Sequence, residues 1–144
     1  MAKKSSEVLT LDGRSLTLAQ VDRFLHGGYS RVEVSARARS AVKKARRFVE
    51  KLLKQDRAVY GVNTGFGKLA NVRIPDDQLG ELQTNLIRSH SCGVGDPLPE
   101  HTVKLAILLR INSLVQGNSG VREEVVDAFV GMLNSDVVPF VPSK

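Results

Sequence analysis

The strongest structural signal in this chain is the stretch 35–54, SARARSAVKKARRFVEKLLK. Its apolar residues recur every three or four positions, which is the spacing of one face of an α-helix. We therefore expect a helix that begins at Ser35 and ends near Lys54, with one apolar and one basic face. The apolar stripe is formed by Ala38, Ala41, Val42, Ala45, Phe48, Val49, Leu52 and Leu53.

The residues before this helix predict two short strands and a smaller helix. Residues 8–11 are apolar and β-prone and run into an Asp-Gly turn, which is typical of a short strand. Thr17 can cap a brief helix that ends at Leu25. Residues 32–34 are expected to form a second short strand.

Three more helices are expected in the rest of the chain. One runs from about residue 76 to His90, and Pro99 suits the first position of the next. Residues 103–115 are apolar on nearly all sides, which predicts burial inside a helix bundle. Residues 121–133 form a last amphipathic helix. The predicted fold is therefore mainly α, the front of a large helical bundle, with short β-strands near the N-terminus.

The composition is typical of a globular protein. The chain has 144 residues, enough for one hydrophobic core, and we predict no domain boundary within 1–144. No apolar run approaches the roughly 18 residues of a membrane span. The lone Cys92 is predicted to be a small buried residue, and no Cys/His cluster suggests a metal. The expected location is cytoplasmic.

The net charge of +6 is concentrated in one segment. Residues 31–57 hold ten basic and three acidic side chains, so the rest of the chain is close to neutral. Such a face could follow nucleic-acid phosphates, but aromatic residues are too few for base stacking. A solvated helix face is the favoured interpretation, and a nucleic-acid-binding module is the alternative. The face consists of Arg37, Arg39, Lys43, Lys44, Arg46, Arg47, Lys51 and Lys54.

Tyr60 opens a glycine-rich segment, YGVNTGFG, at residues 60–67. Glycine lets the backbone approach a ligand closely, and a tyrosine hydroxyl can act as a general acid or base. From composition alone a structural turn is the favoured interpretation, because single glycine-rich loops are weak signals.

His90 lies where a predicted helix ends, in the stretch RSHSCGVG at residues 88–95. A histidine there can bind a substrate or cap the last helical carbonyls. On spacing alone the capping role is favoured. His26 and His101 are predicted to be surface residues.

Polar residues on or after the apolar helix need hydrogen-bond partners if they are buried. We expect most of them to bond between helices. They are Arg110, Asn112, Gln116, Asn118 and Ser119.

Four segments of the chain resemble, in order, motifs of the aromatic amino-acid ammonia-lyases and aminomutases. They are the YGVNTGFG segment at 60–67, residues 85–90 with Gly93-Val94-Gly95, residues 116–122, and residues 138–142. The similarity covers essentially the whole chain. Four motifs in register outweigh the separate structural interpretations of each.

The resemblance implies a mechanism. Enzymes of this family use 4-methylideneimidazol-5-one (MIO), an electrophile made from an internal Ala-Ser-Gly, to release ammonia from an amino acid. By resemblance, Tyr60 is the catalytic tyrosine of a mobile loop and acts in proton transfer. The residues that would shape and close this loop are Gly61, Asn63, Thr64, Gly65, Phe66 and Gly67.

Substrate preference in the family follows the pair that matches Ser89-His90. Histidine lyases carry Ser-His, whereas tyrosine lyases carry His-Leu and phenylalanine lyases usually Phe-Leu. We therefore predict deamination of L-histidine to trans-urocanate, with Ser89 and His90 binding the substrate, because an apolar pair would leave the imidazole nitrogens unsatisfied. A tyrosine or phenylalanine lyase or aminomutase is the nearest alternative.

The chain departs from the family pattern in one respect. It contains no Ala-Ser-Gly and ends at Lys144, just before the expected position of that tripeptide. Alone it is predicted to be inactive, and a fragment with a scaffold role stays an alternative. The resemblance also implies a homotetramer with the remainder of the enzyme chain, without metal, nucleic acid or membrane.

Overall fold

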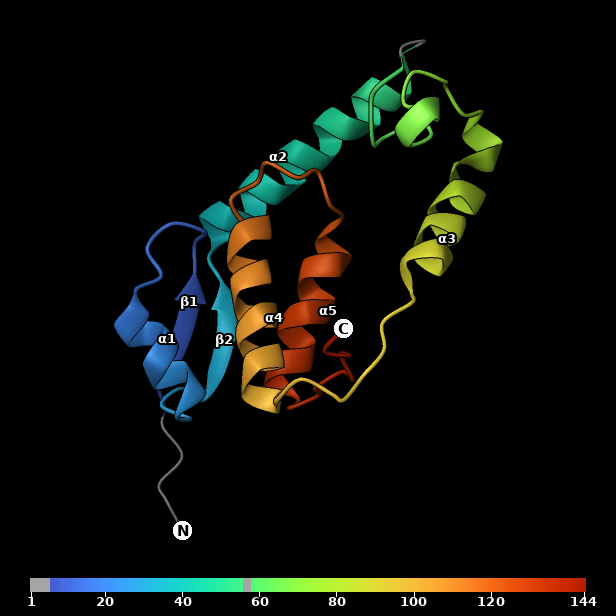
Figure 1. Ribbon diagram of the computed structural model, residues 1–144. Coiled ribbons are helices and arrows are strands. Elements are labelled where there is room, and N and C mark those ends of the chain that lie inside the picture. The colour runs from blue at the N-terminus through green and yellow to red at the C-terminus, as the bar shows by residue number, and fades with distance from the viewer. Residues whose placement is uncertain (1–5, 56–57) are drawn as a thin grey trace. The chain divides into compact units, whose positions relative to one another are not determined.

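The computed structural model describes residues 6–55 and 58–144 and is mainly helical (Figure 1). Its two strands lie near the N-terminus, as the sequence predicts. The elements are β1 (Val8–Leu11), α1 (Leu18–Leu25), β2 (Arg31–Val34), α2 (Ala36–Leu53), η1 (Gly67–Leu69), η2 (Asp76–Gln78), α3 (Leu79–His90), α4 (Glu100–Leu114) and α5 (Glu123–Asn134), where η marks a short 3₁₀ helix.

The contacts of the chain group into two compact units. The first unit comprises residues 1–46 and 97–141, and the second comprises residues 47–96 and 142–144. The strands, α1, α4 and α5 belong to the first unit. The glycine-rich loop and α3 belong to the second.

The two strands pair in parallel, with Leu9 opposite Val32 and Leu11 opposite Val34. These four side chains are buried, whereas Thr10 between them is exposed, because successive strand residues point to opposite faces. Parallel strands need a crossover connection. Here α1 supplies it.

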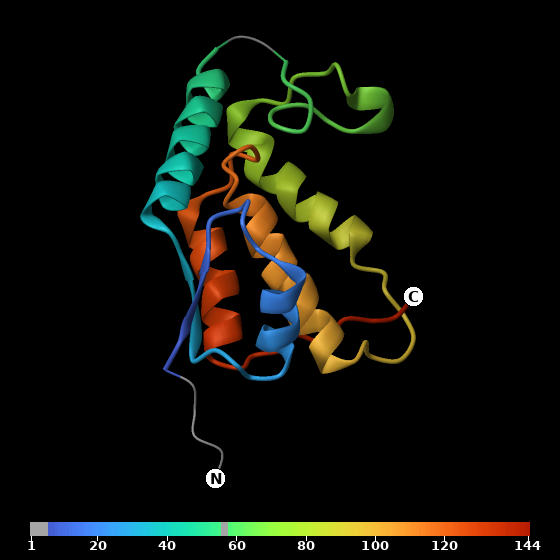
Figure 2. The ribbon, with the colours of Figure 1, turned by 90° about the vertical axis from the view of Figure 1, so that its left-hand side faces the viewer.

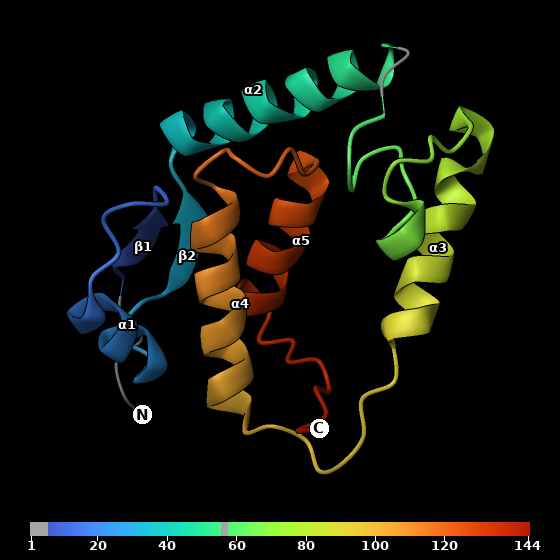
Figure 3. The same cartoon turned by 45° about the horizontal axis from the view of Figure 1, so that its top comes forward.

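Helix α4 carries the centre of the first unit's core. It packs against α5 and α1, while α5 packs against β2 (Figures 2 and 3). Leu108 and Ile111 have no exposed surface. Leu109, on the other side, is 48% exposed, so the predicted burial on nearly all sides is not reached within this chain.

The side chain of Asn134, the last residue of α5, occupies the open edge of β2. Its Oδ1 accepts the Val32 N–H at 2.8 Å, and its Nδ2 donates to the Val32 carbonyl at 3.0 Å. The amide thus replaces a neighbouring strand at one residue, which satisfies backbone groups that a sheet edge leaves unpaired.

A second polar anchor is the turn after β1. The Asp12 carboxylate accepts the N–H groups of Arg14 and Ser15 at 2.8 Å each, and the Ser15 hydroxyl at 2.9 Å. The backbone hydrogen bonds from Ser15 and Arg14 lower the pKa of Asp12 from 3.8 to about 2. The carboxylate form is therefore favoured by folding.

The sequence prediction for Cys92 is wrong. Cys92 is exposed, not buried, because it lies beyond the last turn of α3. The basic face of α2 is solvated, as predicted: none of its eight basic residues is buried, and two of them form surface ion pairs, Arg39 with Asp127 at 2.8 Å and Lys43 with Glu123 at 3.3 Å. These pairs link α2 to α5.

No helix in the described residues is both long enough and apolar enough to cross a membrane. Within the same residues, no group of three or more histidine, cysteine or acidic side chains could hold a metal ion.

We predict that Asn134→Ala lowers the free energy of unfolding by about 1–3 kcal/mol, because it leaves both Val32 backbone groups without their partner. Urea denaturation measures the change. Asn118→Ala is the matched control, since Asn118 is exposed and should be nearly neutral. Equal effects of the two substitutions would contradict this role of Asn134.

We also predict a pH-dependent effect of Asp12→Ala on the melting temperature. A carboxylate with a lowered pKa stabilises the fold above pH 3.8, and that contribution disappears as the pH falls through about 2. The substitution should therefore lower the melting temperature at pH 7 and have little effect near pH 2. A difference that persists unchanged at pH 2 would refute the assignment.

Candidate functional site

The glycine-rich loop is closed by backbone pairing. Thr64 pairs antiparallel with Arg73, and hydrogen bonds join Ile74 N–H to the Asn63 carbonyl at 2.9 Å and Gly65 N–H to the Val72 carbonyl at 3.3 Å. Residues 63–65 and 72–74 therefore form a short two-stranded clasp. Sequence reasoning missed the second half of this clasp, because residues 72–74 carry no distinctive motif.

Two polar side chains of the loop are buried. Asn63 is 0% and Thr64 is 1% exposed. The Asn63 Oδ1 accepts the Val59 N–H at 2.7 Å, and the Thr64 hydroxyl donates to the Gly65 carbonyl at 3.0 Å. Buried polar groups need such partners. These bonds hold the backbone on which Tyr60 is carried.

Tyr60 itself points outward and is 66% exposed. Its ring meets the ring of Phe66 edge to face, with centroids 5.9 Å apart and an interplanar angle of 72°. Gly61 and Gly67 both have positive φ, +73° and +58°, which a residue with a side chain rarely adopts. The motif thus presents a tyrosine hydroxyl on a tightly folded loop.

Ser89 and His90 form the last turn of α3. His90 Nδ1 lies 2.9 Å from the Leu86 carbonyl oxygen and 3.0 Å from Ser89 Oγ, and the same hydroxyl donates to Leu86 at 2.8 Å. The capping contact expected from spacing is therefore present. Both side chains are exposed, so the other imidazole nitrogen is open to a ligand.

The second unit does not bring Tyr60 into contact with His90. The Tyr60 ring meets Phe66, whereas the His90 ring meets Leu86 and Ser89 of its own helix. Helix α3 has no buried residue, and its Ile87 is 67% exposed. A substrate site enclosing both residues is not formed by this unit.

The glycines after His90 have a structural role. A Cβ on Gly93 would lie 2.9 Å from Pro142 Cγ, and Gly95 has φ +93°. They allow residues 142–144 to pair with 94–96, through Val94 N–H to the Lys144 carbonyl at 2.6 Å and Lys144 N–H to the Val94 carbonyl at 2.9 Å. The fourth motif, residues 138–142, therefore leads directly into residues 142–144, which pair with residues 94–96 at the end of the second motif.

The third motif lies in the first unit. A Cβ on Gly117 would come within 2.6 Å of Ala41 Cβ on α2, and Gly117 has φ +79°. Asn112 bonds the Gly13 N–H at 3.1 Å, joining a helix to a turn and not to another helix as predicted. Arg110, Asn118 and Ser119 are exposed. This motif is thus explained by packing.

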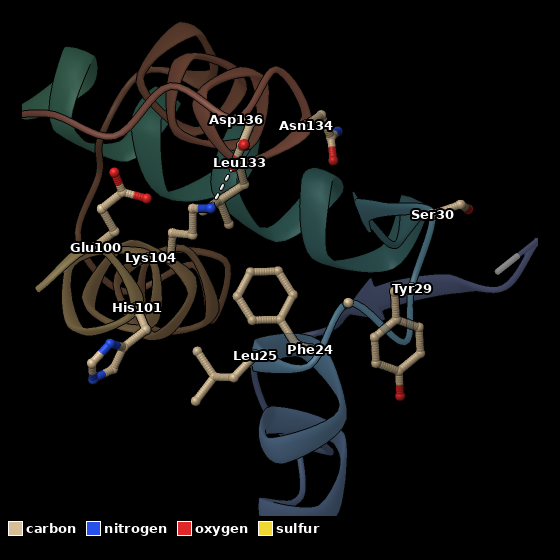
Figure 4. A pocket seen from close by; sticks show the side chains of 11 residues that line it. Phe24, Leu25, Tyr29, Ser30, Glu100, His101, Lys104, Leu133, Asn134 and Asp136 are labelled. Carbon is tan, nitrogen blue, oxygen red and sulfur yellow. Dashed lines mark ion pairs between the residues drawn. The ribbon is translucent and has the colours of Figure 1, made fainter. Parts of the chain in front are cut away.

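The first unit also holds a cavity of about 620 Å³ between α1, α4 and α5 (Figure 4). Phe24 and Leu25 line it, and an ion pair between Lys104 and Asp136 at 2.5 Å crosses it. None of the predicted site residues lines this cavity. Sequence reasoning missed its charged groups because Lys104 on α4 and Asp136 after α5 are far apart in the sequence.

Comparison with known proteins decides the family. The family model "aromatic amino acid lyase" matches residues 16–144. The chain belongs to this family. Histidine ammonia-lyase from Streptococcus sanguinis is 45% identical over 139 residues, which cover 96% of this chain and 27% of that protein.

Solved structures of the family share the fold. Histidine ammonia-lyase from Trypanosoma cruzi matches with a TM-score of 0.82 and 39% identity over 95% of this chain and 27% of its own. The ergothioneine-degrading enzyme ergothionase from Treponema denticola matches with a TM-score of 0.89 and 29% identity, covering 96% and 28%. The predicted helical ammonia-lyase fold is confirmed. The chain spans about a quarter of the length of the curated relatives it matches.

We predict that Asn63→Ala loosens the loop that carries Tyr60. Without the side-chain oxygen the Val59 N–H loses its partner, and its hydrogen-exchange protection should fall roughly tenfold, equivalent to about 1.4 kcal/mol. Amide exchange followed by NMR measures this. Asn71→Ala, at an exposed position of the same loop, is the control and should change nothing at Val59.

Proposed function

We propose that this chain is the N-terminal portion of a histidine ammonia-lyase. As part of the complete enzyme it would convert L-histidine to trans-urocanate and ammonia. The similarity to histidine ammonia-lyases over nearly all of its length supports this proposal. The Ser89-His90 pair, which suits an imidazole substrate, supports it independently.

The observation that carries the proposal is the pairing of residues 142–144 with 94–96. In the family, the sequence that forms the cofactor follows this segment. Because residues 94–96 come shortly after His90, a chain continuing past Lys144 would enter beside the end of α3. The cofactor and the substrate-binding pair would then lie in one region of the complete enzyme.

Each site residue has a proposed role in that enzyme. The Tyr60 hydroxyl transfers a proton, which its exposed position on a closed loop allows. Ser89 and His90 bind the substrate ring at the end of α3. Gly61, Asn63, Thr64, Gly65, Phe66 and Gly67 shape the loop.

The cofactor cannot be formed by these 144 residues, since they contain no Ala-Ser-Gly. When bound, MIO supplies an electrophile that activates the amino acid for loss of ammonia. The residues present here would contribute the proton-transfer group and the substrate pair around it. We propose no metal in the site.

The exposed state of these residues supports an assembly larger than this chain. Closure of an active site expels water and strengthens the polar interactions inside it, yet Tyr60 and His90 are open to solvent. We propose that the remainder of the enzyme chain and other subunits of a cytoplasmic homotetramer cover them. Alone, the chain would be inactive.

A different substrate is the second candidate, because the fold neighbour ergothionase is an ergothioneine-degrading enzyme. Within the family, tyrosine and phenylalanine are further possible substrates. Turnover of the complete enzyme on L-histidine, L-tyrosine and L-phenylalanine, measured as ammonia release, separates these alternatives. Dominant turnover of tyrosine or phenylalanine would overturn the histidine assignment.

An intact-mass spectrum of the native sample tests whether the enzyme is complete. We expect a longer product or a companion polypeptide in which a tripeptide has lost two waters. A sample that holds only the 144-residue species and releases no ammonia from any of these amino acids would favour a fragment with a scaffold role.

We predict that Tyr60→Phe in the complete enzyme lowers kcat by about 100-fold or more, because it removes a proton-transferring hydroxyl. The melting temperature should be unchanged, since this side chain is largely exposed. Tyr29→Phe, at the other tyrosine of these 144 residues, is the control and should retain turnover. Near-normal activity of Tyr60→Phe would remove Tyr60 from the mechanism.

A further inference from the structure

The imidazole of His90 is held at one nitrogen by two oxygens. Its Nδ1 lies 2.9 Å from the Leu86 carbonyl oxygen and 3.0 Å from Ser89 Oγ. Ser89 Oγ lies 2.8 Å from the same carbonyl oxygen. The three groups form a closed triangle at the last turn of α3.

The chemistry of these groups assigns the hydrogens. A carbonyl oxygen only accepts, so the Ser89 hydroxyl and His90 Nδ1 both donate to Leu86. With its own hydrogen directed to Leu86, the Ser89 oxygen can accept a second, longer bond from Nδ1–H. The neutral ring therefore carries its proton on Nδ1, and Nε2 has a free lone pair.

We propose that Ser89 is a positioning residue that fixes the Nδ1–H tautomer of His90, so that Nε2 accepts a hydrogen bond from an N–H group of the substrate ring. This inference rests on the proposed function, in which His90 binds the substrate. A neutral imidazole always has one N–H to offer, whereas a phenyl ring has none. Ser89 therefore acts on substrate specificity through the tautomer of His90.

The other histidines of the chain provide internal references. His26 Nδ1 lies 2.8 Å from the Asp22 carbonyl oxygen four residues earlier, which is the same helical contact without a neighbouring serine hydroxyl. His101 is exposed at the start of α4. Ser91 donates to the Ile87 carbonyl at 2.8 Å and resembles Ser89 in that bond, but it has no contact with a histidine ring within the described residues.

The tautomer is measured directly by NMR of the imidazole nitrogens in the 144-residue chain, at a pH where histidine is neutral. His90 should show a protonated Nδ1. Ser89→Ala removes one of the two acceptors of Nδ1–H, so the Nε2–H fraction of His90 should rise to that of His26, whose Nδ1 meets a carbonyl without a serine hydroxyl, and Ser89→Thr should restore Nδ1–H. Ser91→Ala is the matched control and should leave the His90 spectrum unchanged.

The consequence for specificity is measured in the complete enzyme. Ser89→Ala should raise KM for L-histidine about tenfold with a smaller effect on kcat, and Ser89→Thr should restore it. An amino acid with a 3-pyridyl ring, which accepts but cannot donate, should compete at least about tenfold more weakly than L-histidine. In the Ser89→Ala enzyme this difference should shrink, because Nε2–H can then donate to the pyridyl nitrogen.

The NMR measurement and the kinetic measurement test separate claims. A protonated Nε2 of His90 in the wild-type chain overturns the tautomer assignment, whatever the enzyme does. A Ser89→Ala enzyme with unchanged KM and unchanged discrimination overturns the role in specificity. A complete enzyme that ignores L-histidine overturns the proposed function, while the NMR result still decides the tautomer.

Discussion

The buried side of α4 is the surface on which the first unit is built. Leu108 and Ile111 are completely enclosed, and burial of such side chains stabilises a fold by about 1.5–3 kcal/mol each. Helix α5 connects this core to β2 through packing and through the Asn134 amide. A two-stranded sheet alone is only marginally stable. The strands therefore depend on the helices beside them.

The second unit is held differently, by polar and backbone contacts. Asn63 and Thr64 are buried with hydrogen-bond partners, and two short backbone pairings close the segments on either side of α3. The apolar side chains of α3, in contrast, have no buried position. Function often lies on such loops, held by a scaffold, because they can meet other parts of an assembly. The candidate catalytic and substrate-binding residues all lie here.

His90 shows how a structural and a functional interpretation can hold together. The spacing favoured a helix cap, and the structure confirms a bond from Nδ1 to the Leu86 carbonyl. That bond engages Nδ1 and leaves Nε2 directed away from that carbonyl. The cap and the proposed recognition of an imidazole substrate therefore need no separate residues, and in the proposal the cap and the Ser89 hydroxyl together determine which nitrogen accepts a hydrogen bond.

The sequence by itself determined the helices, the two strands and the family. Contacts such as the Thr17 capping box and the bond of His90 to Leu86 join residues three or four apart, so helical geometry alone implies them. Tertiary structure decided which side chains meet across the chain. Asn134 bonds a residue 102 positions away, and Gly93 makes room for Pro142. Such contacts depend on how separate elements pack, which local periodicity does not specify.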